Sequence, residues 1–125
     1  MKSYTDLEQS KRLAEILPAE SADMFLALNG TLPVMYKYID NGLVTAVDAA
    51  IPCWSLASLF DIIPQEIFDG EYIINITEGL NNRWILTYDH YEHSNHSYYG
   101  LSTDADNLID ACYKLILKLN ELKML

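Results

Sequence analysis

Three histidines lie close together in the last third of the chain, and they are the only histidines of the sequence. They are His90, His93 and His96, and the carboxylates Asp89 and Glu92 lie among them. Imidazole nitrogens and carboxylate oxygens are ordinary ligands for zinc and other transition metals. The three histidines therefore form a candidate site for a metal ion or a small molecule.

The spacing of the histidines leaves this prediction open. In a continuous strand, neighbouring side chains point to opposite faces, so His93 would point away from His90 and His96. A turn at Ser94-Asn95 would let the three rings converge. In the alternative interpretation, these residues only form an exposed hairpin tip, because their spacing matches no zinc motif with fixed ligand positions. We predict no resident cofactor and keep the metal site as an alternative.

Nucleophilic chemistry has little support in the sequence. Cys53 precedes Trp54 in an apolar segment, where no adjacent cation would stabilise a thiolate. Ser55 and Ser58 lack the sequence context of a nucleophile elbow. None of the five glycines belongs to a phosphate-binding loop. We predict no catalytic residue, and the sequence leans away from an enzyme.

Aromatic side chains are concentrated after residue 83. Tyrosine and tryptophan often anchor protein interfaces and line small-molecule clefts. The alternative, which we favour, is cross-strand packing inside a sheet. The candidate binding residues are Trp84, Tyr88, Tyr91, Tyr98 and Tyr99.

The formal charge of −10 results from 18 acidic and 8 basic residues. This balance argues against a broad positive face, so we expect no direct nucleic-acid binding and no attraction to an anionic membrane. It permits a basic protein partner or a surface that imitates nucleic acid, although solubility is the simplest interpretation. With 125 residues, half of them hydrophobic, the sequence predicts one folded domain over 1–125.

The expected compartment is the cytoplasm. No apolar run reaches the roughly 18 residues that span a bilayer. Residues 1–13 are charged and polar and contain no apolar core of a secretory signal. We therefore expect Cys53 and Cys112 to be reduced and buried rather than joined in a disulfide.

Two helices are predicted in the first half of the chain. The first runs from Thr5 to Leu17, with Thr5 and Glu8 as a capping box and Pro18 as its stop. The second is a short buried helix between Pro52, which suits a helix start, and Pro64, which suits a stop.

The residues 102–125 predict a third helix. Thr103 is the expected cap, and Asp104 and Asp106 would lie in the first turn, where the helix dipole favours negative charge. The apolar residues follow a helical period that buries one face. They are Leu108, Cys112, Leu115, Ile116, Leu119 and Leu122.

Strands are predicted between these helices. Asp40-Asn41-Gly42 is a strong turn signal and would join the strands Pro33–Ile39 and Leu43–Val47 in a hairpin. A three-strand antiparallel meander with one solvated face is expected further on. Its strands would be Glu71–Glu78, Arg83–Glu92 and Ser97–Leu101. Ala19–Asn29 fits a helix or a strand. The predicted fold class is α+β, with N-terminal, central and C-terminal helices packed on the antiparallel sheet.

Three segments together carry a resemblance to a known family. They are Glu15–Met24, Pro52–Leu59 and Asp110–Leu119. With these segments the chain resembles a family of small proteins of gut anaerobic bacteria, of prophage or mobile-element type, for which no function is assigned. The resemblance implies a cytoplasmic bacterial or phage origin and brings no catalytic residues.

The sequence alone does not establish a biochemical activity. The first hypothesis is a non-enzymatic acidic binding or accessory protein that acts through protein contacts, with a protein partner or as a homodimer. It is motivated by the negative charge, the many tyrosines and the lack of a chemical motif. The alternatives are metal or small-molecule binding at His90, His93 and His96, and an acidic mimic of nucleic acid.

Overall fold

A computed structural model of the chain describes residues 2–26, 33–35 and 51–125. The predicted α+β class is confirmed, with three α-helices and two antiparallel sheets in these residues. The described chain forms two compact units, Ser3–Ser58 and Leu59–Leu125, and Lys2 belongs to the second. We describe each unit by itself, and the single domain over 1–125 stays a prediction. None of the described helices combines the length and apolar character needed to cross a membrane.

The unit Ser3–Ser58 contains a helix and a small sheet. Helix α1 (Leu7–Ile16) packs against strand β3 (Ile51–Cys53). The sheet order is β2-β1-β3, where β1 is Met24–Leu26 and β2 is Pro33–Met35, and both pairings are antiparallel. The sequence of Ala19–Asn29 fits a helix or a strand. Its described residues form a 3-10 turn (Ala19–Ser21) followed by β1.

The cap of α1 is Asp6, and the predicted Thr5 cap is wrong. The Asp6 carboxylate accepts the Gln9 backbone N–H at 2.8 Å, and the Gln9 side chain accepts the Asp6 N–H at 3.1 Å. Thr5 is instead fully buried, and its hydroxyl oxygen accepts the Trp54 backbone N–H at 3.1 Å. The helix ends at Ile16, one residue before the predicted end at Leu17, and Pro18 follows it as the predicted stop.

The central helix begins later than predicted. Pro52 lies in β3 opposite Phe25, and β3 is an outer strand of the described sheet, where a missing N–H is tolerated. Helix α2 (Leu56–Ile62) begins after Ser55, whose hydroxyl accepts the Ser58 N–H at 3.3 Å. Its end before Pro64 confirms the predicted stop.

The predicted hairpin around Asp40-Asn41-Gly42 lies outside the described residues, apart from Pro33–Met35. These three residues form β2, which pairs with β1. The strand Leu43–Val47 also lies outside the described residues.

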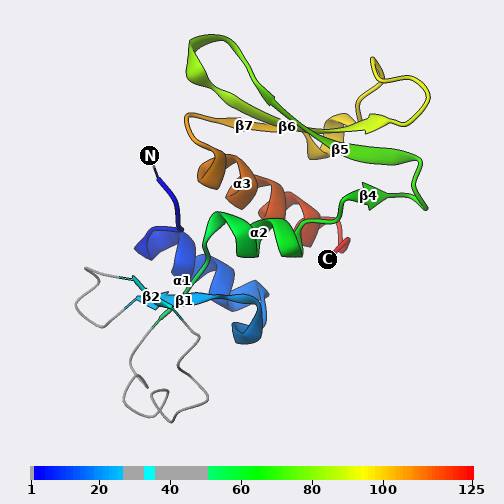
Figure 1. Cartoon of the computed structure of the whole chain (residues 1–125). Helices are drawn as coiled ribbons and strands as arrows, with labels where there is room; N and C mark the ends of the chain where they lie inside the picture. The colour runs from blue at the N-terminus through cyan, green and yellow to red at the C-terminus, as the bar shows by residue number, and fades with distance from the viewer. Residues whose placement is uncertain (1, 27–32, 36–50) are drawn as a thin grey trace. The chain divides into compact units, whose positions relative to one another are not determined.

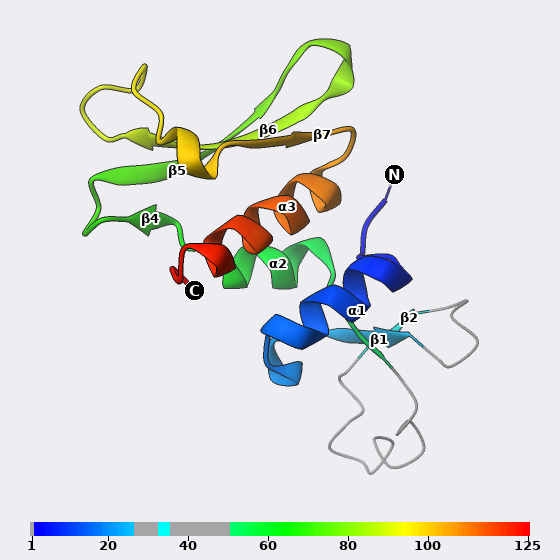
Figure 2. The same cartoon turned by 180° about the vertical axis from the view of Figure 1, so that it is seen from behind.

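The second unit is a four-stranded antiparallel sheet with a helix on one face (Figures 1 and 2). The strand order is β4-β5-β6-β7, from Glu66–Ile67 through Tyr72–Glu78 and Trp84–His90 to Thr103–Ala105. A 3-10 turn (Leu80–Asn82) joins β5 to β6, and both Asn81 and Asn82 have positive φ there. Asparagine tolerates this left-handed conformation better than most residues.

Helix α3 (Leu108–Glu121) packs against β6 and β7. Leu86 and Tyr88 of β6 are fully buried, whereas Ile85, Thr87 and Asp89 alternate with them and are only half-buried. The sheet thus has one covered and one wetter face, as predicted. The buried residues of the helix are Ile109, Ala111, Cys112, Leu115, Ile116 and Leu119. Leu122, beyond the helix, is exposed.

The third strand and the start of α3 differ from the prediction. Ser97 forms only an isolated bridge with Asp89, Tyr99–Leu101 is a 3-10 turn, and the strand is β7. Thr103 pairs with Leu86 and donates its hydroxyl to the Ala111 carbonyl at 3.0 Å, so it is not the helix cap.

The cap of α3 is Asn107, whose side chain accepts the Asp110 N–H at 2.9 Å. Asp104 and Asp106 therefore precede the helix rather than lying in its first turn. Both bind Arg83, each at 2.8 Å.

The position of this cap is testable. Asn107→Ala should lower the free energy of unfolding by about 1 kcal/mol, because an N–H in the first turn loses its acceptor. Asp106→Ala removes only an exposed ion pair and should cost less than about 0.5 kcal/mol. Urea denaturation of both variants checks this, and equal losses would contradict the assignment.

A carboxylate joins two segments of the Ser3–Ser58 unit. Asp23 accepts the Ser55 backbone N–H at 3.0 Å and also the Ser55 hydroxyl. Burial would raise the pKa of Asp23, but the hydrogen bonds from Ser55 and Ser58 outweigh it and lower the pKa below its usual value. Ionised Asp23 therefore stabilises the start of α2.

This carboxylate predicts a specific pH dependence of stability. Because its folded-state pKa is below the unfolded value, its contribution is complete above the unfolded pKa and is lost as the pH falls through the folded pKa. Asp23→Asn should destabilise the protein at neutral pH, and the difference from the wild type should shrink in acid. Urea denaturation across a pH series measures this; a constant difference would refute it.

Candidate functional site

One end of the four-stranded sheet carries a continuous group of rings, which we call the ring cluster. Phe68 lies 5.2 Å from Tyr98 and 6.0 Å from Tyr72, between ring centroids. Tyr72 lies 5.4 Å from His90, and His90 stacks on Tyr91 at 5.0 Å. The full set is Phe68, Tyr72, His90, Tyr91, His93, His96 and Tyr98.

The sheet register positions these rings. Tyr72 and His90 are directly opposite each other on β5 and β6, so their side chains share a face. Phe68 enters from the turn between β4 and β5, where Phe68, Asp69 and Gly70 have φ of 53°, 57° and 87°. A left-handed conformation is rare for a phenylalanine. This turn leaves Phe68 48% exposed beside the two tyrosines.

The loop after β6 brings the three histidines together. The His90 N–H donates to the His96 carbonyl at 2.9 Å, and the His96 N–H donates to the His93 carbonyl at 2.8 Å. The ring centroids of His90 and His93 are 5.2 Å apart, and those of His93 and His96 are 5.6 Å apart. The three rings are thus neighbours because the chain turns here, which the sequence alone did not decide.

Neighbouring rings do not by themselves form a metal site. Among the described residues, no group of three or more His, Cys, Asp or Glu side chains is arranged to hold a metal ion. The His90 Nδ1 accepts the Glu92 N–H at 3.1 Å, and its Nε2 is 3.7 Å from a Glu71 carboxylate oxygen. His90 and His93 stack face to face, whereas metal ligands direct in-plane nitrogens to one point.

The five aromatic residues predicted for binding are dispersed. Tyr91 is 60% exposed and Tyr98 half-buried, and both belong to the ring cluster. Tyr99 is 82% exposed in the following turn. Trp84 lies at the other end of β6, opposite Glu78. Tyr88 is fully buried and donates its hydroxyl to the Pro64 carbonyl, so it is part of the core.

Sequence reasoning missed two members of the ring cluster, Phe68 and Tyr72. Phe68 is followed by Asp69-Gly70, a residue pair that is typical of turns. Tyr72 is the first apolar residue of the predicted strand Glu71–Glu78. The missing information was the register that places Tyr72 opposite His90.

The chain around the ring cluster is acidic. Residues 59–100 contain seven carboxylates, and Arg83 is the only lysine or arginine among them. Arg83 lies at the other end of β6, where it binds Asp104 and Asp106. Glu71 and Glu92 are exposed next to the rings. Asp89 accepts hydrogen bonds from Ser97 at 2.6 Å and Asn75 at 2.9 Å, which hold it on the sheet.

Both cysteines are free and fully buried, as predicted. Burial raises the pKa of Cys53, and it raises the pKa of Cys112 to about 12. At neutral pH both therefore remain thiols, which are poor nucleophiles.

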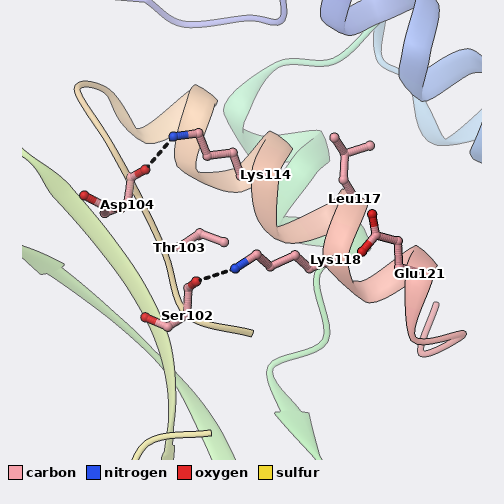
Figure 3. A pocket seen from close by; sticks show the side chains of 7 residues that line it. All are labelled: Ser102, Thr103, Asp104, Lys114, Leu117, Lys118 and Glu121. Atoms are coloured by element: carbon pink, nitrogen blue, oxygen red, sulfur yellow. Dashed lines mark hydrogen bonds between the residues drawn. The ribbon is translucent and has the colours of Figure 1, made fainter. Parts of the chain in front are cut away.

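A hollow of about 400 Å³ lies between α3 and β7 (Figure 3). Lys114 donates to the Asp104 carbonyl and Lys118 to the Ser102 carbonyl, each at 2.9 Å. Both ammonium groups are thus engaged with the backbone of the sheet edge. We assign these lysines a structural role.

Comparisons with protein-family models, with curated proteins and with solved structures found no match for this chain. The resemblance to the prophage-type family therefore stays a prediction.

The arrangement of the imidazoles predicts that the protein retains no stoichiometric transition metal. Native mass spectrometry of the untagged protein, incubated with zinc and then desalted, should give the apo mass with and without a chelator. An adduct of one zinc ion that the chelator removes, and that His93→Ala abolishes, would contradict this expectation and favour the histidine site.

Proposed function

We propose that this chain is a non-enzymatic binding protein and that its ring cluster receives lysine or arginine side chains of a basic protein partner. The observation that carries the proposal is the run of contacting rings beside exposed carboxylates. The only lysine or arginine of residues 59–100, Arg83, is engaged at the other end of the sheet.

The chemistry of the cluster favours a cation. The face of an aromatic ring attracts an ammonium or guanidinium group, and Tyr and Phe both provide such faces. Glu71 and Glu92 add opposite charge at the rim, which mainly speeds association and selects the partner. The charge of −10 acts in the same direction over longer distances.

The other hypotheses are less well supported. A metal at His90, His93 and His96 requires the rings to turn from their stacked arrangement. Mimicry of nucleic acid would use rows of carboxylates, whereas Asp89, Asp104 and Asp106 are each bound to other side chains.

The proposal predicts binding of an arginine-rich peptide. Isothermal titration should detect binding that weakens as salt is added, because the charges are exposed and therefore screened. Tyr91→Ala should weaken it roughly two- to five-fold, the size of an exposed cation–π contact. Tyr91→Phe should preserve the affinity, since it retains the ring.

A second pair of variants separates local recognition from general attraction to an acidic protein. Glu71→Gln lies beside the rings, and Glu78→Gln makes the same change in charge at the other end of β5. We expect only Glu71→Gln to weaken binding measurably. Equal effects of both variants, or full affinity in Tyr91→Ala, would refute the ring cluster as the binding surface.

A further inference from the structure

His90 makes a hydrogen bond that only its unprotonated form can make. Its Nδ1 atom accepts the Glu92 backbone N–H at 3.1 Å. An imidazole nitrogen that accepts a hydrogen bond carries no proton, whereas both nitrogens of an imidazolium are donors. The arrangement of His90 and Glu92 therefore belongs to the neutral side chain, with its proton on Nε2.

The other nitrogen of His90 lies beside a carboxylate. Nε2 is 3.7 Å from a Glu71 carboxylate oxygen, and the Tyr91 N–H donates to the Glu71 carbonyl at 3.0 Å, which keeps Glu71 next to the end of β6. The His90 side chain is 17% exposed. A second proton on this ring would therefore place a cation within ion-pair distance of Glu71.

His90 also lies against the face of an exposed ring. It stacks on Tyr91, with ring centroids 5.0 Å apart and ring planes 22° apart. A cation within about 6 Å of the centroid is attracted by the face of an aromatic ring. Protonated His90 would thus contact the two groups that we propose for a partner's cation, the Tyr91 ring and the Glu71 carboxylate.

The other two histidines lie further from these groups. His93 is 5.2 Å from His90, and His96 is 5.6 Å from His93, between ring centroids. Within the described part of the chain, the side chains of His93 and His96 make ring contacts but no hydrogen bond. His90 is therefore the histidine whose protonation state is tied to the structure of the ring cluster.

The elements packed against β6 direct their charges elsewhere. On helix α3, the two lysines donate to backbone carbonyls at the sheet edge, Asp110 binds Lys2 at 2.8 Å, and Glu121 lines the hollow beside β7. The turn Tyr99–Leu101 contains no charged residue. Asp89 precedes His90 on the strand and therefore points to the opposite face, where Ser97 and Asn75 bind it.

We propose that protonation of His90 releases a basic partner from the ring cluster. The inference rests on the proposed function, because it concerns the regulation of the same surface. With His90 neutral, Glu71 and the ring faces are open to a guanidinium group of the partner. With His90 protonated, the chain supplies this cation itself, and the new Nδ1–H displaces the Glu92 N–H.

A proton and a partner that compete for one site are linked reciprocally. Each partner molecule that binds must release the proton from any protonated His90, and acid must weaken binding by the same coupling. Histidine is the side chain that ordinarily changes its charge between pH 5 and 8. Ordinary carboxylates stay ionised over most of this range, so the general attraction to a basic partner persists.

Isothermal titration of the full chain with an arginine–glycine peptide at constant ionic strength tests this proposal. We expect the affinity to be roughly three- to tenfold weaker at pH 5.5 than at pH 7.5, because one imidazole takes up a proton between them. At pH 6.5, the heat should differ between buffers of different ionisation enthalpy in the sense of proton release.

Matched variants locate the effect at His90. His90→Asn keeps an acceptor for the Glu92 N–H, and His90→Phe keeps the ring, but neither can take up a proton. Both should bind the peptide nearly equally at the two pH values. His96→Gln also removes one imidazole and should retain most of the pH dependence. Circular dichroism verifies the fold of each variant.

A measurement on the free wild-type protein keeps the proposal testable if the variants do not fold. In nitrogen-15 NMR, the His90 Nδ1 should be unprotonated at pH 7.5, and the Glu92 amide signal should shift as His90 takes up its proton. A proton on Nδ1 at pH 7.5, or a Glu92 amide that does not respond, would overturn the proposal.

The titrations separate this proposal from the proposed function. A wild type that binds no peptide at pH 7.5 would refute the proposed function and its regulation together. Equal affinity of the wild type at both pH values would refute the regulation alone. Loss of the pH dependence in His96→Gln to the same extent as in His90→Asn would show a general effect of charge and would also refute the role of His90.

Discussion

The packing of α3 against β6 is the interaction on which the second unit depends. Leu86 and Tyr88 are fully buried on one face of β6, as are Leu115 and Ile116 on the helix. Because strand side chains alternate, a slip of one residue would move Leu86 and Tyr88 to the wetter face. The apolar contact thus determines which residues of β6 point inward and, through the pairing of β5 with β6, which residues of β5 lie beside them.

That register has different consequences at the two ends of β5. At one end it places Tyr72 beside His90, and the turn containing Phe68 and the loop containing Tyr98 complete the ring cluster. At the other end, β5 continues beyond β4, and no described strand pairs with its outer edge at Ile76 and Glu78. The surface that we propose for cations therefore depends on this strand pairing.

The sequence predicted those parts of the fold that local patterns determine. The apolar period after Leu108 and the alternation around Leu86 and Tyr88 located the core helix and the central strand. The ends of the helices and strands were less predictable, because tertiary contacts override the local conformational preference of a residue. Thr103 suits a cap but is held by Ala111, and Pro52 suits a helix start but lies in an outer strand. For the candidate site, the histidines were visible in the sequence, whereas Phe68 and Tyr72 join them only through a register that no local pattern specifies.

The register of β5 and β6 is therefore the most direct test of this account, and NMR can measure it. In an antiparallel pair, opposite residues that share no hydrogen bond have close Cα atoms, about 4.5 Å apart, and give strong Hα–Hα NOEs. The account predicts such NOEs between Tyr72 and His90, Ile74 and Tyr88, and Ile76 and Leu86. NOEs that join Ile73 to His90 or Asn75 to Tyr88 would show a register shifted by one residue and would contradict the ring cluster.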